Sequence, residues 1–135
     1  MEDAALTSSH FLTLLGYSVG LLLTHIAIQA SLATRELGLT WNTGARDDAL
    51  KPKGIYAARA ERALSNFKET YPAFIGLALA LAIAGDNGLG VIGAWLWLGC
   101  RLIYIPLYLA GVPYLRTVVW GTSVLGLILM MNSLL

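Results

Sequence analysis

The chain has 135 residues, of which 57% are hydrophobic and only 13% are charged. Soluble domains carry about 25% charged residues, so this composition favours a membrane protein. The net charge of +1 argues against a nucleic-acid partner. Cys100 is the single cysteine, which excludes an intrachain disulfide and a Cys-x-x-Cys redox pair, and we predict no metal site.

Four apolar segments are predicted to form membrane-spanning helices. In chain order they cover residues 8–35, 55–84, 88–111 and 114–134. Crossing the hydrocarbon core takes roughly 20 residues, and the alternation typical of strands is absent, so helices are the only spanning option. The sequence therefore predicts an all-α integral membrane protein, with one domain over residues 1–135 folded as a four-transmembrane-helix bundle.

The breaks between these segments support this division. Glu36–Gly54 is a polar connection, "GDNG" at Gly85–Gly88 predicts a tight turn, and Gly111–Pro113 ends the third helix. The apolar stretch Pro72–Gly85 is too short to span alone. The second helix therefore needs to include the preceding segment "RAERALSNFKETY", although that segment is polar.

Basic residues predict the orientation. Seven of the nine Lys and Arg residues lie in or beside the first connection, and Arg116 lies beside the third. The positive-inside rule then places the 1–2 and 3–4 loops in the cytoplasm and both termini outside. The short loops, without a eukaryotic retrieval signal, favour a bacterial inner membrane.

Polar residues gather on helix faces that should meet. At about 100° per residue, Arg62, Asn66 and Glu69 point at about 0°, 40° and −20° on the second helix. On the third helix, Arg101, Tyr104 and Tyr108 also share one face. Arg101 lies roughly 15 Å before Gly111, at about 1.5 Å per residue. A charge at that depth costs several kcal/mol unless it is paired, so it should face the bundle interior.

The fourth helix adds Arg116, with Trp120 and Ser123 on the same side. Guanidinium groups suit carboxylates and developing anions, whereas a carboxylate suits an amine. A ligand with two carboxylates, an ammonium and a thiol would satisfy most of these groups. Glutathione is such a ligand, but the residues do not select it over other zwitterionic anions.

Structural interpretations stay open for each of these groups. The polar face of the second helix fits a capped, solvated helix start with an ion pair, and Arg101 fits an interior salt bridge. The two tyrosines fit an interfacial aromatic belt, and Arg116 fits a positive-inside anchor.

The ordered motifs resemble the MAPEG family, the membrane-associated proteins in eicosanoid and glutathione metabolism. They are Arg62-Ala63-x-x-Asn66-x-x-Glu69-x-x-Pro72, then Arg101-x-x-Tyr104-x-x-x-Tyr108-x-x-Gly111, then Arg116. The resemblance implies a homotrimer with glutathione as co-substrate, bound near the cytoplasmic side between subunits. It implies thiolate stabilisation by Arg116 and glutathione contacts from Arg62, Asn66, Glu69, Tyr104, Tyr108, Arg101 and, as a weaker match, Arg35. Arg101 is also expected to pair with Glu69.

The resemblance also implies a glutathione transferase or peroxidase mechanism. A cation beside sulfur favours the thiolate, which attacks a lipophilic electrophile that enters from the lipid. Trp120 stands where some catalytic members have a tyrosine, and Thr70 stands where some relatives carry an aromatic residue.

Two alternatives to this enzyme are a non-catalytic lipid-binding or scaffold protein on the same fold and a small proton-coupled exporter. An exporter of this kind needs a carboxylate within the first helix, and Phe11–Ala33 contains none. It is therefore the least favoured of the three.

Overall fold

The computed structural model describes residues 2–86 and 88–135, with side chains from Ser8 onward. Every regular element within these residues is a helix. Four of them are long and apolar enough to cross a membrane, which confirms the prediction of an all-α, multi-pass fold. They are α1 (Glu2–Leu37), α3 (Ile55–Ala84), α4 (Leu89–Ala110) and α5 (Pro113–Leu134).

The observed helix bounds lie close to the predicted ones, with two differences. α1 begins earlier and ends slightly later than residues 8–35, and a short helix without fully buried residues, α2 (Leu39–Thr43), lies in the first connection. Gly88 and Gly111 flank α4 with φ of 97° and 76°. A positive φ favours glycine, and these two residues mark the start and the end of α4.

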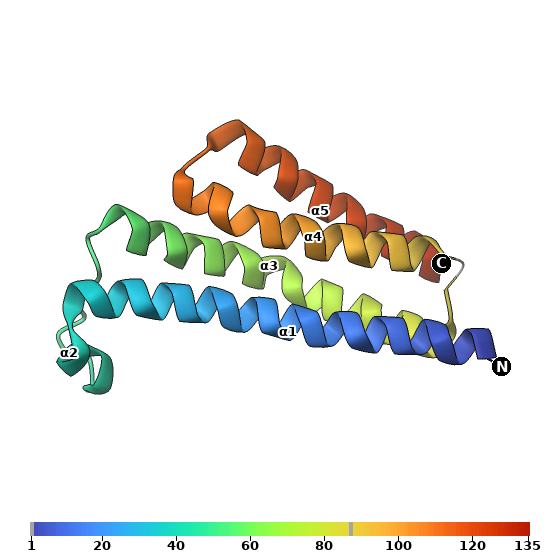
Figure 1. Ribbon diagram of the computed structural model, residues 1–135, viewed down its shortest axis with the longest axis horizontal. Coiled ribbons are helices and arrows are strands. Elements are labelled where there is room, and N and C mark those ends of the chain that lie inside the picture. Colours follow the sequence, from blue (N-terminus) through green and yellow to red (C-terminus); the bar gives the residue numbers. More distant parts are fainter. Residues whose placement is uncertain (1, 87) are drawn as a thin grey trace.

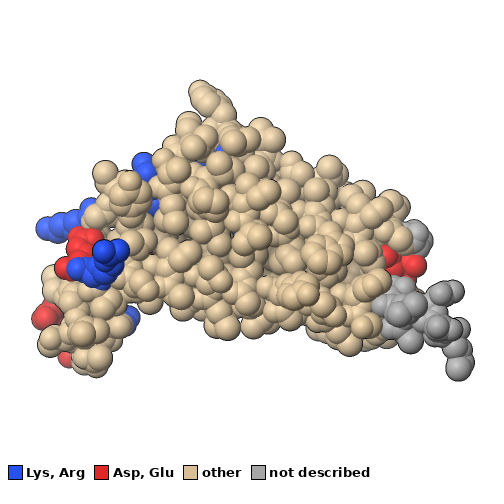
Figure 2. Space-filling model, in the orientation of Figure 1, with Lys and Arg blue, Asp and Glu red and all other residues tan. Residues whose placement is uncertain are grey.

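The helices form two antiparallel pairs, α1 with α3 and α4 with α5, and α3 joins the pairs (Figure 1). The α1–α3 and α4–α5 connections lie at one end of the molecule, and the termini lie with the α3–α4 turn at the other. The visible face in Figure 2 carries most of its charged residues near the ends, with an almost uncharged belt between them. This is the charge distribution expected of a membrane-spanning bundle.

Aromatic side chains fill the interface between the two pairs. Phe74 stacks on Trp97 with ring centroids 4.0 Å apart, and Phe67 lies 5.6 Å from the same indole. All three are fully buried. Tyr71 adds a hydrogen bond of 3.0 Å between its hydroxyl and that of Ser18 on α1. Large rings and one satisfied polar pair thus hold α3 against both neighbours.

Two buried glycines let α4 and α5 cross closely. A Cβ atom on Gly93 would lie 3.0 Å from the backbone nitrogen of Met130, and one on Gly126 would lie 2.9 Å from that of Trp97. Small residues allow this approach between membrane helices, where backbone packing replaces the hydrophobic driving force. The crossing fixes the position of α5, and with it the side chains at its start.

At each end of the bundle, a carboxylate accepts hydrogen bonds from backbone nitrogens at the start of a helix. Glu36 accepts hydrogen bonds from the backbone nitrogens of Lys53 and Gly54 at the start of α3. At the other end, Asp86 accepts from the backbone nitrogens of Gly90 and Val91 at 2.8 and 2.9 Å, and from Ser133. Burial raises the pKa of Asp86, but these hydrogen bonds outweigh it and hold the pKa below its ordinary value.

Candidate functional site

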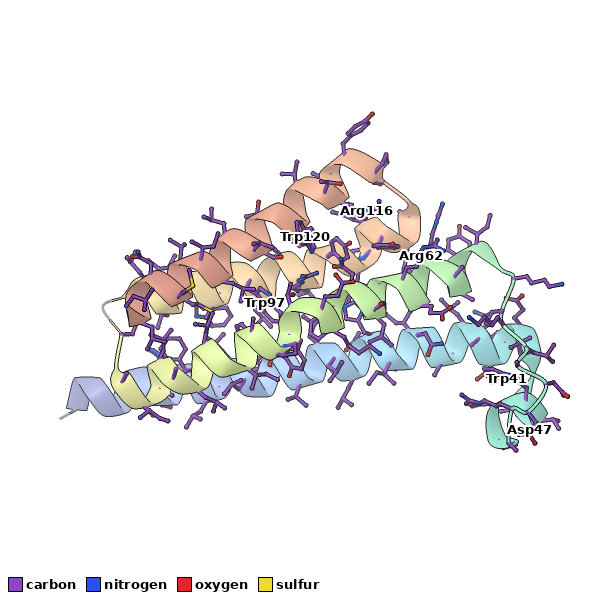
Figure 3. All side chains as sticks on the ribbon, turned by 180° about the vertical axis from the view of Figure 1, so that it is seen from behind. Trp41, Asp47, Arg62, Trp97, Arg116 and Trp120 are labelled. Atoms are coloured by element: carbon purple, nitrogen blue, oxygen red, sulfur yellow. The ribbon has the colours of Figure 1, made fainter. Side chains whose placement is uncertain are left out.

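Residues from three helices line one polar cavity of about 340 Å³. Four of them, Asn66, Tyr104, Tyr108 and Arg116, were predicted site residues; Thr117 and Trp120 complete the lining. In Figure 3, Arg116 and Trp120 lie on α5, with Trp120 between Arg62 and Trp97 along the bundle, and both lie far from Trp41 and Asp47 in the first connection. The predicted convergence of polar faces from α3, α4 and α5 therefore holds for these four residues.

Two phenols and a guanidinium group form a connected part of the cavity wall. Tyr104 and Tyr108 lie one helical turn apart, with ring centroids separated by 5.4 Å. The Arg116 Cζ atom lies 4.5 Å from the centroid of the Tyr108 ring. This distance is within the range of a cation–π contact, which holds a cation without neutralising it. Arg116 thus keeps its charge and its donors available to a ligand.

Arg101 lies beside the cavity, fully buried. Its Nη1 donates to Asn66 Oδ1 at 2.7 Å and its Nη2 to Thr70 Oγ1 at 2.6 Å. The expected partner Glu69 is not among these acceptors, and its carboxylate acts on the guanidinium only over a longer distance. Two neutral acceptors one turn apart on α3 take its place, because they face α4 whereas Glu69 does not.

The helical angles explain where Arg62 and Glu69 lie. The buried face of α3, which includes Phe67, centres near 140° from Arg62, at about 100° per residue. Asn66, at about 40°, reaches the edge of this face, whereas Arg62 at 0° and Glu69 at about −20° do not. Both are exposed on the single chain, and neither lines the cavity. They share a helix face with Asn66 in the sequence, but only Asn66 reaches the cavity.

Arg35 lies in a different place. It is exposed near the end of α1 and lines a separate cavity of about 260 Å³. That cavity is formed by the end of α1 and the start of α3, including Glu36, Gly54 and Tyr56. Within one chain, the structure does not bring Arg35 to the residues around Arg116.

Arg59 at the start of α3 holds the end of α4 in place. Its Nη1 donates to the Leu109 carbonyl oxygen at 2.8 Å, which satisfies one of the free carbonyls at the helix end. A Cβ atom on Gly111 would lie 2.7 Å from the Arg59 Cζ atom. Gly111 is therefore required both for the left-handed turn and to leave space for the Arg59 side chain. The bond from Arg59 to Leu109 holds the last turn of α4, which carries Tyr108.

Sequence reasoning gave Thr70 and Thr117 no site role. Thr70 lies four residues after Asn66, the spacing that places two side chains on neighbouring turns of one helix face, and this signal was available. Thr117 follows Arg116 directly. Trp120 was recognised as a departure from a tyrosine, and the structure places its indole in the cavity wall, where the buried Nε1 has no hydrogen-bond partner among the described residues.

The cavity lining favours ligands that accept hydrogen bonds and carry negative charge. The six lining residues supply a guanidinium, an amide, two phenols, a hydroxyl and an indole, and no carboxylate. Arginine donors recognise carboxylates and other anions strongly, more so away from bulk water. The arrangement can therefore bind an anion and stabilise negative charge that forms during a reaction.

A comparison with family models identifies the chain. The model described as the MAPEG family matches residues 14–135, nearly the whole chain. Comparisons with curated proteins and with solved structures gave no significant match. The match covers α1 from residue 14 onward, the other three spanning helices and every residue of the polar cavity. The chain therefore belongs to the MAPEG family, which includes both glutathione transferases or peroxidases and non-catalytic members.

Proposed function

We propose that the protein is a glutathione-dependent membrane transferase or peroxidase that acts on lipophilic electrophiles. The observation that carries this proposal is the polar cavity between three spanning helices in which Asn66, Tyr104, Tyr108 and Arg116 converge. It lies between helices that are otherwise mostly apolar, and its lining favours an anionic ligand. Family membership makes glutathione the leading candidate for that ligand.

In this proposal Arg116 is the catalytic residue. Its guanidinium, supported by the Tyr108 ring at 4.5 Å, lies beside the sulfur and favours the thiolate. The thiolate attacks the electrophile, a carbon–sulfur bond forms, and the leaving group departs with its electron pair. With a hydroperoxide, the thiolate attacks oxygen and releases the alcohol, and a second glutathione then forms the disulfide and water.

We further propose that the site is completed in a homotrimer. Arg62 and Glu69 are exposed on the single chain, and the small residues Ser65, Ala73 and Gly76 share their face of α3. Small residues favour close helix packing in membranes. If a neighbouring copy packs on this face, Arg62 and Glu69 of the first chain would lie at the interface, toward the bound tripeptide. Arg35 on the α1 helix of the neighbouring copy would lie toward it as well. The mass of the detergent-solubilised protein by native mass spectrometry tests this stoichiometry.

The orientation is also a proposal. The two connections at one end of the molecule, with most of the basic residues, would face the cytoplasm of a bacterial cell, and both termini would lie outside the inner membrane. The α1–α3 and α4–α5 connections share an end, as this topology requires (Figure 1). Labelling of single cysteines placed in each connection would test it.

The decisive experiment follows the glutathione thiolate by its ultraviolet absorbance as glutathione is titrated into the purified protein. We expect bound thiolate at neutral pH in the wild type, because each pKa unit by which the thiol is lowered needs only about 1.36 kcal/mol of preferential interaction. Arg116→Ala should remove this signal and Arg116→Lys should keep part of it. Binding without any thiolate in the wild type, or none at all, would overturn the proposal.

One observation favours the alternative of a non-catalytic lipid-binding protein. An apolar cavity of about 310 Å³ lies between α1 and α4, lined by Tyr17, Leu21, Thr24, Trp95, Leu98 and Leu102. A protein with this role would retain phospholipid through purification and would leave glutathione protonated. Lipid extraction with mass spectrometry, beside the thiolate titration, separates the two functions.

A further inference from the structure

Arg101 is held in one orientation by two acceptors on α3. Asn66 Oδ1 and Thr70 Oγ1 accept from its two terminal nitrogens at 2.7 and 2.6 Å, one from each. Its guanidinium lies 5.5 Å from the Tyr104 ring centroid and 5.9 Å from that of Trp97. Arg101 is fully buried and does not line the cavity, so it cannot act on a ligand there by direct contact.

The contact with Arg101 decides which end of the Asn66 amide faces the cavity. A guanidinium group has only donors, so the Asn66 atom that meets it must be the carbonyl oxygen. The side-chain amide nitrogen is therefore left free on a residue that lines the cavity. The orientation of an asparagine amide is assigned from its hydrogen-bond partners, and here the partner leaves one choice.

We propose that Thr70 and Arg101 are positioning residues that turn the amide N–H groups of Asn66 into the cavity, so that the site selects a ligand oxygen at this point. The ligand group is an acceptor, a carboxylate or carbonyl oxygen, and not an ammonium. Thr70 fixes the guanidinium, the guanidinium fixes the amide, and the amide meets the ligand. This inference rests on the proposed function, because it names the group of the co-substrate that Asn66 receives.

The charge of Arg101 acts in the same direction. Among the described residues its hydrogen-bond acceptors are neutral, and no carboxylate forms an ion pair with it. The Glu69 carboxylate acts on this guanidinium only from beyond ion-pair distance, so the buried cation is offset in part and still raises the positive potential in the adjacent cavity. An anion beside Asn66 would therefore be favoured both by the orientation of the amide and by the charge behind it.

The test compares Thr70→Val with Thr70→Ser in the full-length, detergent-solubilised protein. Valine has the shape of threonine but no acceptor for Arg101 Nη2, whereas serine keeps the hydroxyl. We expect Thr70→Val to weaken glutathione binding about tenfold and Thr70→Ser less than about twofold. The thiolate fraction of bound glutathione should stay at the wild-type value in both, because Arg116 sets it.

A second variant, Asn66→Asp, separates positioning from a purely structural role. An aspartate would form an ion pair with Arg101 and should raise the unfolding temperature, yet it would offer the cavity only acceptors. We expect a more stable protein whose glutathione affinity falls about tenfold or more. The same variant in an Arg101→Gln background should lose the gain in stability.

The outcomes are distinct. If the wild type binds glutathione and Thr70→Val binds it as tightly as Thr70→Ser does, this inference is overturned. The proposed function would still stand. Unchanged glutathione affinity in Asn66→Asp would do the same. A wild-type protein that binds no glutathione would overturn the proposed function and, with it, the role assigned here to Asn66.

Discussion

Two cavities of similar size differ in nearly everything else. The polar cavity between α3, α4 and α5 measures about 340 Å³, and the apolar cavity between α1 and α4 about 310 Å³. The first is lined by a guanidinium, an amide, two phenols, a hydroxyl and an indole, whereas the second is lined mostly by aliphatic and aromatic groups. Volume alone does not distinguish them.

The difference in lining has a thermodynamic consequence within a membrane. An acyl chain can fill the apolar cavity at little cost, because lipid tails are as apolar as its walls. The polar cavity has no such occupant: its donors, among them Arg116 and the Trp120 indole, stay unsatisfied unless water or a polar ligand meets them. Polar lining that hydrocarbon cannot satisfy is therefore what identifies a candidate site in this bundle.

The largest expected effect concerns Arg116, the only cation that lines the polar cavity within the described residues. Arg116→Ala should lower kcat/KM for conjugation of a lipophilic aryl halide about 100-fold, because the charge that stabilises the thiolate is lost. Steady-state kinetics in detergent measure this. Thr24→Ala in the apolar cavity is the matched control. Equal losses in the two variants would contradict the distinction between the cavities.

Gly111→Ala should distort the polar cavity from its edge. The residue has a φ of 76°, and a Cβ atom would meet the Arg59 guanidinium. We expect a loss of about 2 kcal/mol in unfolding free energy from the strained backbone. Thermal unfolding measures it, with Gly99→Ala as control because a Cβ there meets nothing within 4 Å. The same loss in both variants would contradict the importance of both the positive φ and the contact with Arg59 at Gly111.

Tyr108→Phe keeps the ring against Arg116 and removes only the hydroxyl. Glutathione affinity should fall about fivefold, the effect of one lost hydrogen bond. The bound thiolate fraction should stay constant, because the cation–π contact survives. Isothermal titration calorimetry together with the thiolate absorbance tests this, and a lost thiolate signal at full binding would contradict it.

Asp86 should make the stability of the protein depend on pH. It lies at the end of the bundle away from the α4–α5 connection. Because its folded-state pKa lies below the ordinary value, its stabilising effect is present at neutral pH and is lost as pH falls below about 4. Asp86→Ala should lower the Tm by about 3 °C at pH 7 and by much less in acid. Glutathione affinity should not change. A Tm difference that persists at low pH would be contrary to this account.

The smallest effect is expected from filling the apolar cavity. Thr24→Leu adds an apolar side chain to its lining and should change glutathione affinity less than about twofold, because no polar group of the other cavity is touched. Retention of phospholipid should decrease. A large loss of glutathione binding would show that the two cavities are coupled.

The sequence was sufficient for the fold and for part of the site. Length and hydropathy predicted the four spanning helices, since membrane helices must satisfy their own backbone. The spacing that placed Asn66 with Arg62 and Glu69 did not reveal which edge of that face meets α4, because helix rotation depends on packing around residues such as Phe67. The role of Thr70 depends on an arginine 31 residues away, and no local pattern contains that contact.

The structure of the protein determined with bound glutathione tests the central claim most directly. We predict density for the tripeptide in the polar cavity, with its sulfur beside Arg116 and an oxygen within hydrogen-bond distance of Asn66 Nδ2. Glutathione bound elsewhere, with Arg116 still on Tyr108 and the polar cavity filled by lipid, would contradict the account.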